Sequence, residues 1–390
     1  MDKKLLSTVI IIAVIIASMG AVIVYDHNIH KDTDSSGSTY NVIARVNSEG
    51  SGIYIKESVL SAKGGASEFY DTTTYDVTGK GAAWGGLIFG TPGAATIQHI
   101  QLQSMVEKMG LTFTLYQSGM ATDSSHVYYV LNIANKTAAV ADPNINGGIV
   151  WEPQFSAIVD DTSNDYVSLG LTNDFFSGHT CCIIAGYSSY MQTHADQTNR
   201  FLAAYIKGVE WVLDPANHDA LVALGKDKTG ITDDAVINDS LDHITYLYDD
   251  VSDDLSQLRK DIAELSQDLP ALKHTVQDLG FANAYQFASR FVDDSYMMSA
   301  IDIHNDTSYS YSGPKSSIKV ACIAGDIHQI ALHAAVAQGF FDEYGLIVTV
   351  SAATNGPGVA TALQNGEAQF GLMGAPPATS TAINGMLVTY

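Results

Sequence analysis

The chain has little cysteine and few positive charges. Its 390 residues include three cysteines, two of them adjacent, an arrangement that strains a disulfide. The sequence is therefore not a disulfide scaffold. Lys and Arg number 19 against 42 Asp and Glu, and the net charge of −23 disfavours nucleic acid and anionic membrane surfaces as partners. No Walker phosphate-binding pattern is present, so ATPase activity is not expected of this chain.

A long apolar run stands near the start of the sequence. Leu5 to Tyr25 carries no charged side chain, and a helix over it would span roughly 30 Å, the thickness of a bilayer core. Two lysines precede the run, which predicts a cytoplasmic N-terminus and an extracytoplasmic bulk. We expect residues 1–26 to be a membrane anchor, with a cleaved signal segment as the alternative, and residues 27–40 to be a polar tether.

After residue 40 the pattern is that of an α/β protein, and 46% of the chain is hydrophobic. Apolar residues recur on one stripe over 201–212 and predict an amphipathic helix that Asp214-Pro215 ends. Near the C-terminus, strands and helices alternate, and right-handed crossovers make the strands parallel. The predicted β-α-β-α-β elements are 318–323, 327–338, 346–350, 359–365 and 369–373.

Motifs in this C-terminal part resemble the beginning of a known family. They are GDIHQ at 325–329, GFFDEYGL at 339–346, NGPGV at 355–359 and GAPP at 374–377. In this order they resemble the opening of the first lobe of periplasmic-type solute-binding proteins of ABC importers, in the nitrate/sulfonate/taurine (NitT/TauT) family. Residues 41–300 resemble the remainder of such a protein.

The resemblance implies a circular permutation. Joining residue 390 to residue 41 would restore the family order almost without a gap, and a linker over 303–317 would connect the former termini. We therefore expect Tyr390 beside residues 39–41, and strands 318–323 and 42–46 in one sheet. A decayed tandem pair and a C-terminal piece that completes a neighbouring molecule by swapping are the alternatives.

The implied fold is α/β, a two-lobed type II periplasmic-binding-protein fold with a hinge and an interlobe cleft, preceded by one transmembrane helix. The expected division of the chain is lobe I strands and the crossing to lobe II at 41–60, lobe II at 61–185, lobe I helices and the C-terminal part of the family fold at 186–302, the linker at 303–317, and the N-terminal part of lobe I at 318–390.

The implied function is that of an extracytoplasmic receptor which captures a small solute and delivers it to an importer. Its partners would be the solute, an ABC permease, separate ATPase subunits and the membrane through the N-terminal helix, without nucleic acid, cofactor, metal or catalytic residues. The alternatives are an enzyme on the same fold, similar to relatives that make a thiamine pyrimidine precursor, and a sensory ectodomain without transport.

Candidate ligand-binding residues lie where strands end and helices begin, because unpaired backbone N–H groups and the helix dipole meet there. Structural roles are open alternatives, such as a helix cap for Asp326, a tight turn at Gly374 and a core position for Trp151. The candidates are Asp326, His328, Gln329, Gly374, Ala375, Pro376, Asn47, Ser48, Gly50, Ser51, Thr91, Gly93, Ala95, Thr96, Gln98, Trp151, Glu152 and His179.

The ligand class is only weakly indicated by the sequence. Backbone dipoles and hydroxyls favour a nitrate-, sulfonate- or taurine-like anion, with Arg45 as the one fixed cation in the cleft segments. An aromatic or apolar ligand would instead use Trp151 and Tyr54. His179 beside Cys181 and Cys182 suggests a metal or a nucleophile, but neighbouring side chains of a strand point to opposite sides, so inert thiols at the hinge are favoured.

Overall fold

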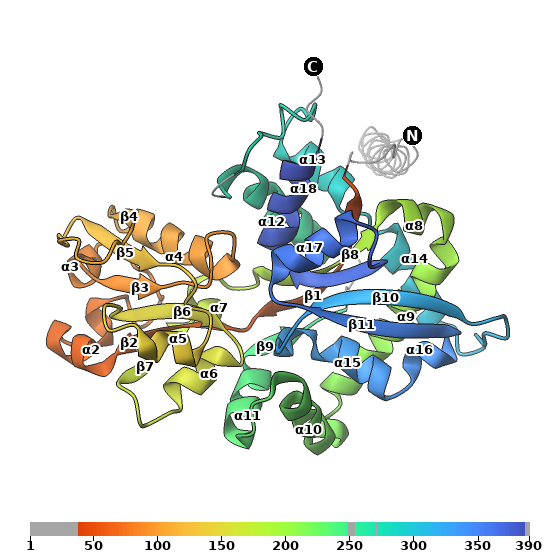
Figure 1. Ribbon diagram of the computed structural model, residues 1–390, viewed down its shortest axis with the longest axis horizontal. Coiled ribbons are helices and arrows are strands. Elements are labelled where there is room, and N and C mark those ends of the chain that lie inside the picture. The colour runs from red at the N-terminus through yellow and green to blue at the C-terminus, as the bar shows by residue number, and fades with distance from the viewer. Residues whose placement is uncertain (1–37, 249–253, 270–271, 387–390) are drawn as a thin grey trace, which may run out of the picture. The chain divides into compact units, whose positions relative to one another are not determined.

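Two six-stranded sheets organise the described part of the chain, which in this computed structural model is residues 38–248, 254–269 and 272–386. Both sheets belong to one compact unit, Ser38–Tyr390. Each sheet with its helices is called a lobe below (Figure 1). The lobe I sheet has the order β11 (Leu346–Ala353), β10 (Ser316–Ile323), β12 (Phe370–Gly374), β8 (Thr180–Tyr187), β1 (Tyr40–Glu49) and β9 (Ile244–Tyr246).

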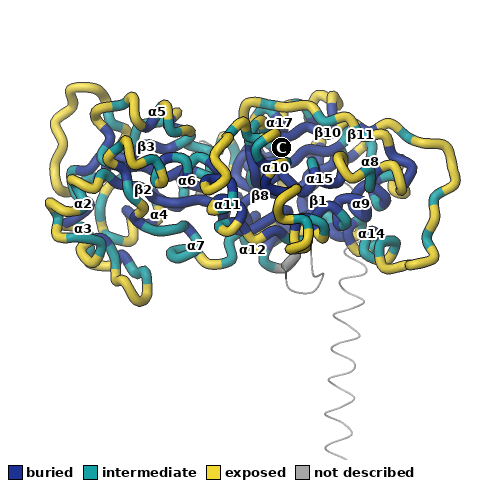
Figure 2. Tube along the Cα trace, turned by 90° about the horizontal axis from the view of Figure 1, so that it is seen from below, coloured by how far each residue is buried: buried dark blue, intermediate teal, exposed yellow. Residues whose placement is uncertain are grey.

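The lobe I sheet is mixed and is covered on both faces. Strands β10, β11 and β12 are parallel, while β8 runs antiparallel to both β12 and β1. Along β8, Ile183 and Ala185 join one hydrophobic cluster, and Ile184 joins another on the opposite face, as the alternation of a strand requires. Figure 2 accordingly shows β1 and β8 as buried. The prediction that 42–46 and 318–323 share one sheet is confirmed.

Helices from residue 188 onward belong to lobe I. The longest fully described one is α9, whose buried stripe includes the predicted 201–212 region and which ends before Asp214. The lobe I helices are α8 (Ser188–Thr193), α9 (Ala195–Leu213), α10 (His218–Thr229), α11 (Asp234–Asp242), α12 (Asp254–Asp268), α13 (Ala284–Phe291), α14 (Ser295–Asn305), α15 (Ile330–Ala337), α16 (Phe340–Glu343), α17 (Gly356–Gln364) and α18 (Ala375–Gly385), with short 3-10 turns η2 (Pro215–Asn217) and η3 (Ile327–Gln329).

Lobe II is a smaller α/β unit with its own two hydrophobic clusters. Its strand order is β4 (Thr112–Leu115), β5 (His126–Val130), β3 (Ile88–Gly90), β6 (Gly147–Trp151), β2 (Ser51–Lys56) and β7 (Tyr166–Leu171). Strands β3, β4, β5 and β6 are parallel, and β2 is antiparallel to β6 and β7. Its helices are α2 (Glu57–Lys63), η1 (Ala66–Glu68), α3 (Gly81–Trp84), α4 (Ile97–Lys108), α5 (Lys136–Ala141), α6 (Gln154–Val159) and α7 (Thr172–Phe175).

The first crossing between the lobes lies within the expected segment, and the return boundary differs from the expected one. Strand β2 pairs with β6 and β7, so the chain crosses to lobe II at Gly50, early in the expected 41–60 segment. The return crossing lies between β7 and β8, and β8 pairs with β1 and β12 of lobe I rather than belonging to lobe II as the 61–185 boundary implied. The reason is physical: β8 fills the gap between β12 and β1, and without it the lobe I sheet would divide.

The connection between α14 and β10 is packed, although it was expected to be a plain polar linker over 303–317. It covers residues 306–315, because the helix and the strand extend into the expected segment at its two ends. The guanidinium of Arg200 lies 4.0 Å from the ring centroid of Tyr311 and donates to the carbonyl of Tyr344 at 2.5 Å. The connection is thereby held against α9.

Three predictions fall wholly or partly outside the described residues. The anchor at 1–26 lies outside them, the tether at 27–40 is described only from residue 38, and Tyr390 is not described, so its expected place beside 39–41 stays a prediction. Within the described ranges, no helix has the length and apolar character needed to span a bilayer.

Helix α9 joins the C-terminal part of the chain to the rest of lobe I, which makes a core variant informative. Phe201 stacks on Phe370 of β12 at 4.1 Å between ring centroids and on Phe341 of α16 at 5.3 Å. We expect Phe201→Ala to lower the free energy of unfolding by about 3–5 kcal/mol in a denaturant titration. The exposed control Tyr285→Ala (62% exposed) should change it by less than about 0.5 kcal/mol. Equal effects would contradict the packing described.

Candidate functional site

A cavity of about 460 Å³ is lined by residues of both lobes. Lobe II contributes residues 92–98, which lead into the first turn of α4, two residues after β5 and Trp151 at the end of β6. Lobe I contributes Cys181 and Cys182 at the start of β8, and residues that follow β10, β11 and β12. The cavity size lies within the range of small-molecule sites, about 300–1,000 Å³.

The cavity sits at the carboxyl ends of parallel strands in both lobes. In lobe I, Ile323, Thr354 and Gly374 stand at or just after the ends of β10, β11 and β12, and all three line it. In lobe II, the lining segments follow β3 and β5 or end β6. Crevices outside the carboxyl ends of strands are where ligands bind in open α/β sheets. Two such edges therefore face one space.

Eight of the residues proposed from the sequence line this cavity. The segment that leads into the first turn of α4 supplies four of them, and the others come from the end of β6, the segment after β10 and the end of β12. They are Gly93, Ala95, Thr96, Gln98, Trp151, Asp326, His328 and Gly374.

Ten other candidates do not line the cavity, and some of them contact the residues that do. Ser51 accepts a hydrogen bond from the Gln98 side chain at 2.8 Å, and Thr91 bonds the ring of His99 at 3.0 Å. Gln329 is fully buried and binds the carbonyl of Leu372. The ten are Asn47, Ser48, Gly50, Ser51, Thr91, Glu152, His179, Gln329, Ala375 and Pro376.

The structure also corrects three side-chain interpretations. Tyr54 is buried in the lobe II core against Tyr166 and does not reach the cavity. Arg45 is buried and donates to the carbonyl of Gly178 at 2.5 Å, so it is a structural cation at the return crossing. His179 bonds the carbonyl of Phe176 and lines a separate hollow between α4 and α12.

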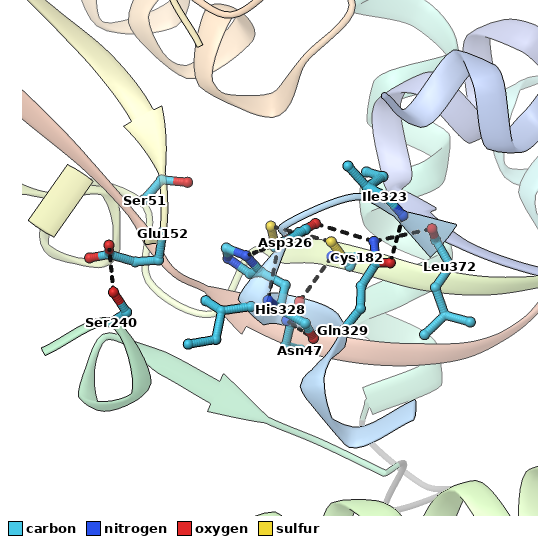
Figure 3. A network of polar contacts seen from close by, with 12 residues as sticks. Asn47, Ser51, Glu152, Cys182, Ser240, Ile323, Asp326, His328, Gln329 and Leu372 are labelled. Atoms are coloured by element: carbon cyan, nitrogen blue, oxygen red, sulfur yellow. Dashed lines mark hydrogen bonds and ion pairs between the residues drawn. The ribbon is translucent and has the colours of Figure 1, made fainter. Parts of the chain in front are cut away.

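The segment after β10 forms the polar core of the site (Figure 3). Asp326 caps the η3 turn by accepting from the backbone N–H of His328 at 3.0 Å, and its carboxylate lies 2.8 Å from Nδ1 of the same residue. Gln329 donates to the other carboxylate oxygen at 3.2 Å and accepts from the N–H of Ile323 at 2.9 Å. The expected capping role of Asp326 and its place in the cavity are thus both observed.

His328 is arranged as a cation. Its Nδ1 faces a carboxylate, and its Nε2 lies 3.2 Å from the carbonyl oxygen of Glu49, so both ring nitrogens face acceptors and both donate. Burial opposes a charge on the ring, but Cys181 and Asp326 outweigh it and hold the pKa of His328 well above its usual value. A protonated imidazole therefore forms part of the wall.

A glycine is required at position 50, where the chain crosses to lobe II and packs against the imidazole of His328. Its φ is +86°, in the region that favours glycine, and a Cβ there would lie 2.2 Å from Nε2 of His328. Asn47 completes the contact by donating to the carbonyl of His328 at 3.1 Å and accepting from the N–H of Cys182 at 3.1 Å. These bonds join the two crossings to the η3 turn.

Three helices begin at the cavity. Thr96, Asn355 and Gly374 are the N-cap residues of α4, α17 and α18, and each lines it. In α4 the Thr96 hydroxyl accepts from the N–H of His99 at 3.3 Å, which leaves the first N–H groups of the helix for a ligand. Prolines replace donors at the starts of α17 and α18, so α4 offers the fullest set.

The groups of the cavity wall that carry positive charge are the helix N-termini and the His328 ring. Among the described residues that line the cavity, none is Lys or Arg. Nor do the described residues contain a group of three or more His, Cys, Asp or Glu side chains arranged to hold a metal. The N–H groups and hydroxyls of the wall are the donors open to a ligand, whereas both ring nitrogens of His328 already face protein acceptors and the Asp326 carboxylate lines the same space.

Several lining residues were not among the candidates. Asn355, Gly356 and Pro357 form a capped helix start like the one at Thr96, and the Asn-Gly-Pro-Gly motif was the available signal. Asn132 follows β5, and nothing in its sequence context singled it out. The thiols of Cys181 and Cys182 lie 3.8 Å apart and both belong to one cluster, so the expectation that they point to opposite sides is wrong.

Glu152 forms a second polar cluster, between the lobes. Its side chain is fully buried (0% exposed) and accepts from Ser156 in lobe II and from Ser240 and His243 in lobe I. The Glu152–His243 contact is 2.6 Å, and the bond from Glu152 raises the pKa of His243. Burial, then nearby carboxylates, raise the pKa of Asp160 to about 6. This cluster links α6 to α11.

Comparisons with known proteins returned one solved structure. No protein-family model and no curated protein matches the chain. The chain is similar to the crystal structure of the periplasmic nitrate-binding protein NrtA from Synechocystis PCC 6803, with 13% identity and a TM-score of 0.48 over 82% of this chain and 81% of that one. The ligand and partners of this chain are therefore argued from its own residues.

The interlobe cluster predicts a pH-dependent stability. Because the pKa of His243 is raised in the folded chain, its contribution is complete below the unfolded value near 6.5 and is lost as pH rises through the raised value. The raised pKa of Asp160, about 6, acts in the same direction. Between pH 6 and 8 the free energy of unfolding should fall more for the unaltered chain than for His243→Asn, as measured by urea titration.

Glu152→Gln is the matched variant, because it keeps the shape and removes the charge that raises the pKa of His243. It should lower stability at pH 6, since the ion pair with His243 is lost, and should flatten the pH dependence as His243→Asn does. A slope identical in all three proteins would contradict a stabilising role for this pair.

Proposed function

We propose that this chain is an extracytoplasmic solute-binding protein that captures a small anion between its lobes and delivers it to an ABC importer. The observation that carries the proposal is the cavity itself, where carboxyl ends of parallel strands from two sheets and three helix N-termini meet. In this proposal the protein is a receptor and does not convert the solute chemically.

An anion is favoured by the polarity of the wall. The α4 N-terminus presents backbone N–H groups, the Thr96 hydroxyl stands beside them, and the His328 imidazolium faces the same space. The chain's net charge of −23 does not oppose this, because the field inside a site is set by the groups that line it. Nitrate and small sulfonates carry the charge that these groups favour, and taurine, a zwitterion, would present its sulfonate to them.

Binding would proceed by closure about the two crossings. The chain passes between lobes at Gly50 and again between β7 and β8, so two short segments can act as the hinge. The closed form would then be recognised by a permease, with ATP hydrolysed by separate subunits. Residues 1–26 are proposed to be a single-pass anchor in the cell membrane that keeps the rest of the chain on the extracytoplasmic side.

We further propose that the fold is circularly permuted. Counted from β10, the three parallel strands of lobe I take the order 2-1-3, a usual doubly wound arrangement, and β8, β1 and β9 complete the sheet. The connection over 306–315 would then be the join between former termini. The single sheet formed by both parts of the chain supports this proposal, and a truncated tandem pair remains the alternative.

A ligand screen by thermal unfolding tests the function. The purified full chain is melted with nitrate, nitrite, bicarbonate, taurine and short alkylsulfonates, and with ammonium and choline as cationic controls. An anion present at 100 times its Kd should stabilise the fold by about 2.7 kcal/mol. Stabilisation by the cations alone would overturn the anion proposal.

Two hydroxyl variants locate the binding. Thr96→Ala removes the cap of α4 at the cavity and should weaken the bound anion about tenfold, measured by calorimetry. Ser48→Ala is the control, because Ser48 is buried in β1 and does not line the cavity. Equal affinities for both variants and the unaltered chain would place the ligand elsewhere.

A further inference from the structure

The two adjacent cysteines of β8 are placed as a reactive pair. Cys181 and Cys182 are free thiols, 3% and 4% exposed, and both line the cavity between the lobes. Their sulfur atoms lie 3.8 Å apart. A small reagent that enters the cavity therefore meets both.

An irregular strand pairing brings both sulfurs to one side. The β1–β8 register pairs Asn47 with Cys182 and then Ser48 with Thr180, so Cys181 has no partner in the ladder. Such a bulge turns a side chain away from the normal alternation. Cys181 consequently joins the same hydrophobic cluster as Cys182.

The surroundings make the two thiols unequal. Hydrogen bonding from Cys182 and the charge of His328 hold the pKa of Cys181 well below its usual value, while Cys181 raises that of Cys182. His328 is in turn fixed by Asp326 at 2.8 Å. Low-pKa cysteines beside a cation are the nucleophilic ones, whereas structural buried cysteines are inert.

Cys322 provides an internal comparison. It is also a free, buried thiol of lobe I, in β10, but it does not line the cavity. Burial raises the pKa of Cys322 to about 11. The contrast shows that burial alone does not lower the pKa of a thiol in this lobe.

We propose that Cys181 and Cys182 form a redox-active dithiol in the cavity wall, oxidised by a small peroxide. The Cys181 thiolate attacks one peroxide oxygen, the O–O bond breaks, and Cys181 becomes a sulfenic acid as hydroxide leaves. The Cys182 thiol then attacks the Cys181 sulfur, an S–S bond forms, and water leaves. Two electrons pass from the sulfurs to the peroxide. Two equivalents of an external thiol then reduce the disulfide to the two cysteine thiols and are themselves oxidised to a disulfide.

A bond between adjacent cysteines has a consequence for reversibility. The ring it closes is strained, because the two Cα atoms are closer than an ordinary disulfide requires. Strained disulfides have higher reduction potentials and are readily reduced, which suits a reversible modification rather than a structural bridge. The pair would therefore report the redox state of the compartment.

Oxidation also changes the charge of the cavity. The reduced pair places a thiolate beside the site, and the disulfide carries no charge, so an anion should bind the oxidised form more tightly. This consequence rests on the proposed function, whereas the dithiol chemistry does not. Nitrate affinity measured on both forms separates the two, because absence of nitrate binding leaves the dithiol result intact.

The test uses the full chain, reduced, freed of reductant and given limiting hydrogen peroxide at pH 6. Free thiols are then blocked with N-ethylmaleimide and the peptides weighed. We expect the peptide with residues 181–182 to lose two hydrogens and escape blocking, at least about tenfold faster than Cys322 reacts. Oxidation of Cys181 no faster than Cys322, or a sulfenic acid that persists in the unaltered chain, would overturn the proposal.

Four variants assign the roles. Cys182→Ser should stop at a sulfenic acid that dimedone traps, Cys181→Ser should leave residue 182 reduced, and Cys322→Ser should behave as the unaltered chain. His328→Asn, checked for folding by thermal melt, should slow the reaction at pH 6 about tenfold and make its rate rise steeply with pH. An unchanged pH profile in His328→Asn would remove the imidazole from the mechanism.

Discussion

The contact between His328 and the crossing strand is the interaction on which the site depends. The imidazole stands between the carboxylate of Asp326 and the carbonyl of Glu49, at the point where the chain leaves lobe I for lobe II. The imidazole leaves no space for a side chain at Gly50. Asn47 hydrogen-bonds both His328 in the η3 turn and Cys182 at the start of β8. A buried ion pair of this kind is costly to break, because one partner would remain charged without compensation.

Two polar clusters lie near the crossings between the lobes, and they have different roles. The cluster around His328 faces the cavity and sets its charge, whereas the cluster around Glu152 lies away from the cavity lining and joins α6 to α11. Both contain a histidine bound to a carboxylate, but only the first adjoins a thiol. Ligand binding and lobe contact thus respond to different groups, although both clusters are carried by segments next to the crossings.

The wall of the cavity holds the groups that would bind the proposed anion in this acidic protein. The lining has no Lys or Arg among its described residues; its positive groups are helix starts and the His328 ring, and that ring is paired with the Asp326 carboxylate. Such groups are fixed by the fold and need little reorganisation when a ligand enters. Hydrogen bonding from Cys182 and the charge of His328 lower the pKa of Cys181, so His328 is common to the proposed anion site and the proposed dithiol.

The sequence by itself determined the α/β class, the parallel C-terminal strands, the α9 stripe and the helix starts at Thr96 and Asp326, because these depend on local periodicity and capping. Only the tertiary structure decided which of these segments meet. Ser48 and Thr91 were indistinguishable in sequence from Thr96, yet pairing buries them behind the wall. The side on which Cys181 lies depends on a bulge in the β1–β8 register, which two strands separated by more than 130 residues set together, and no local pattern encodes it.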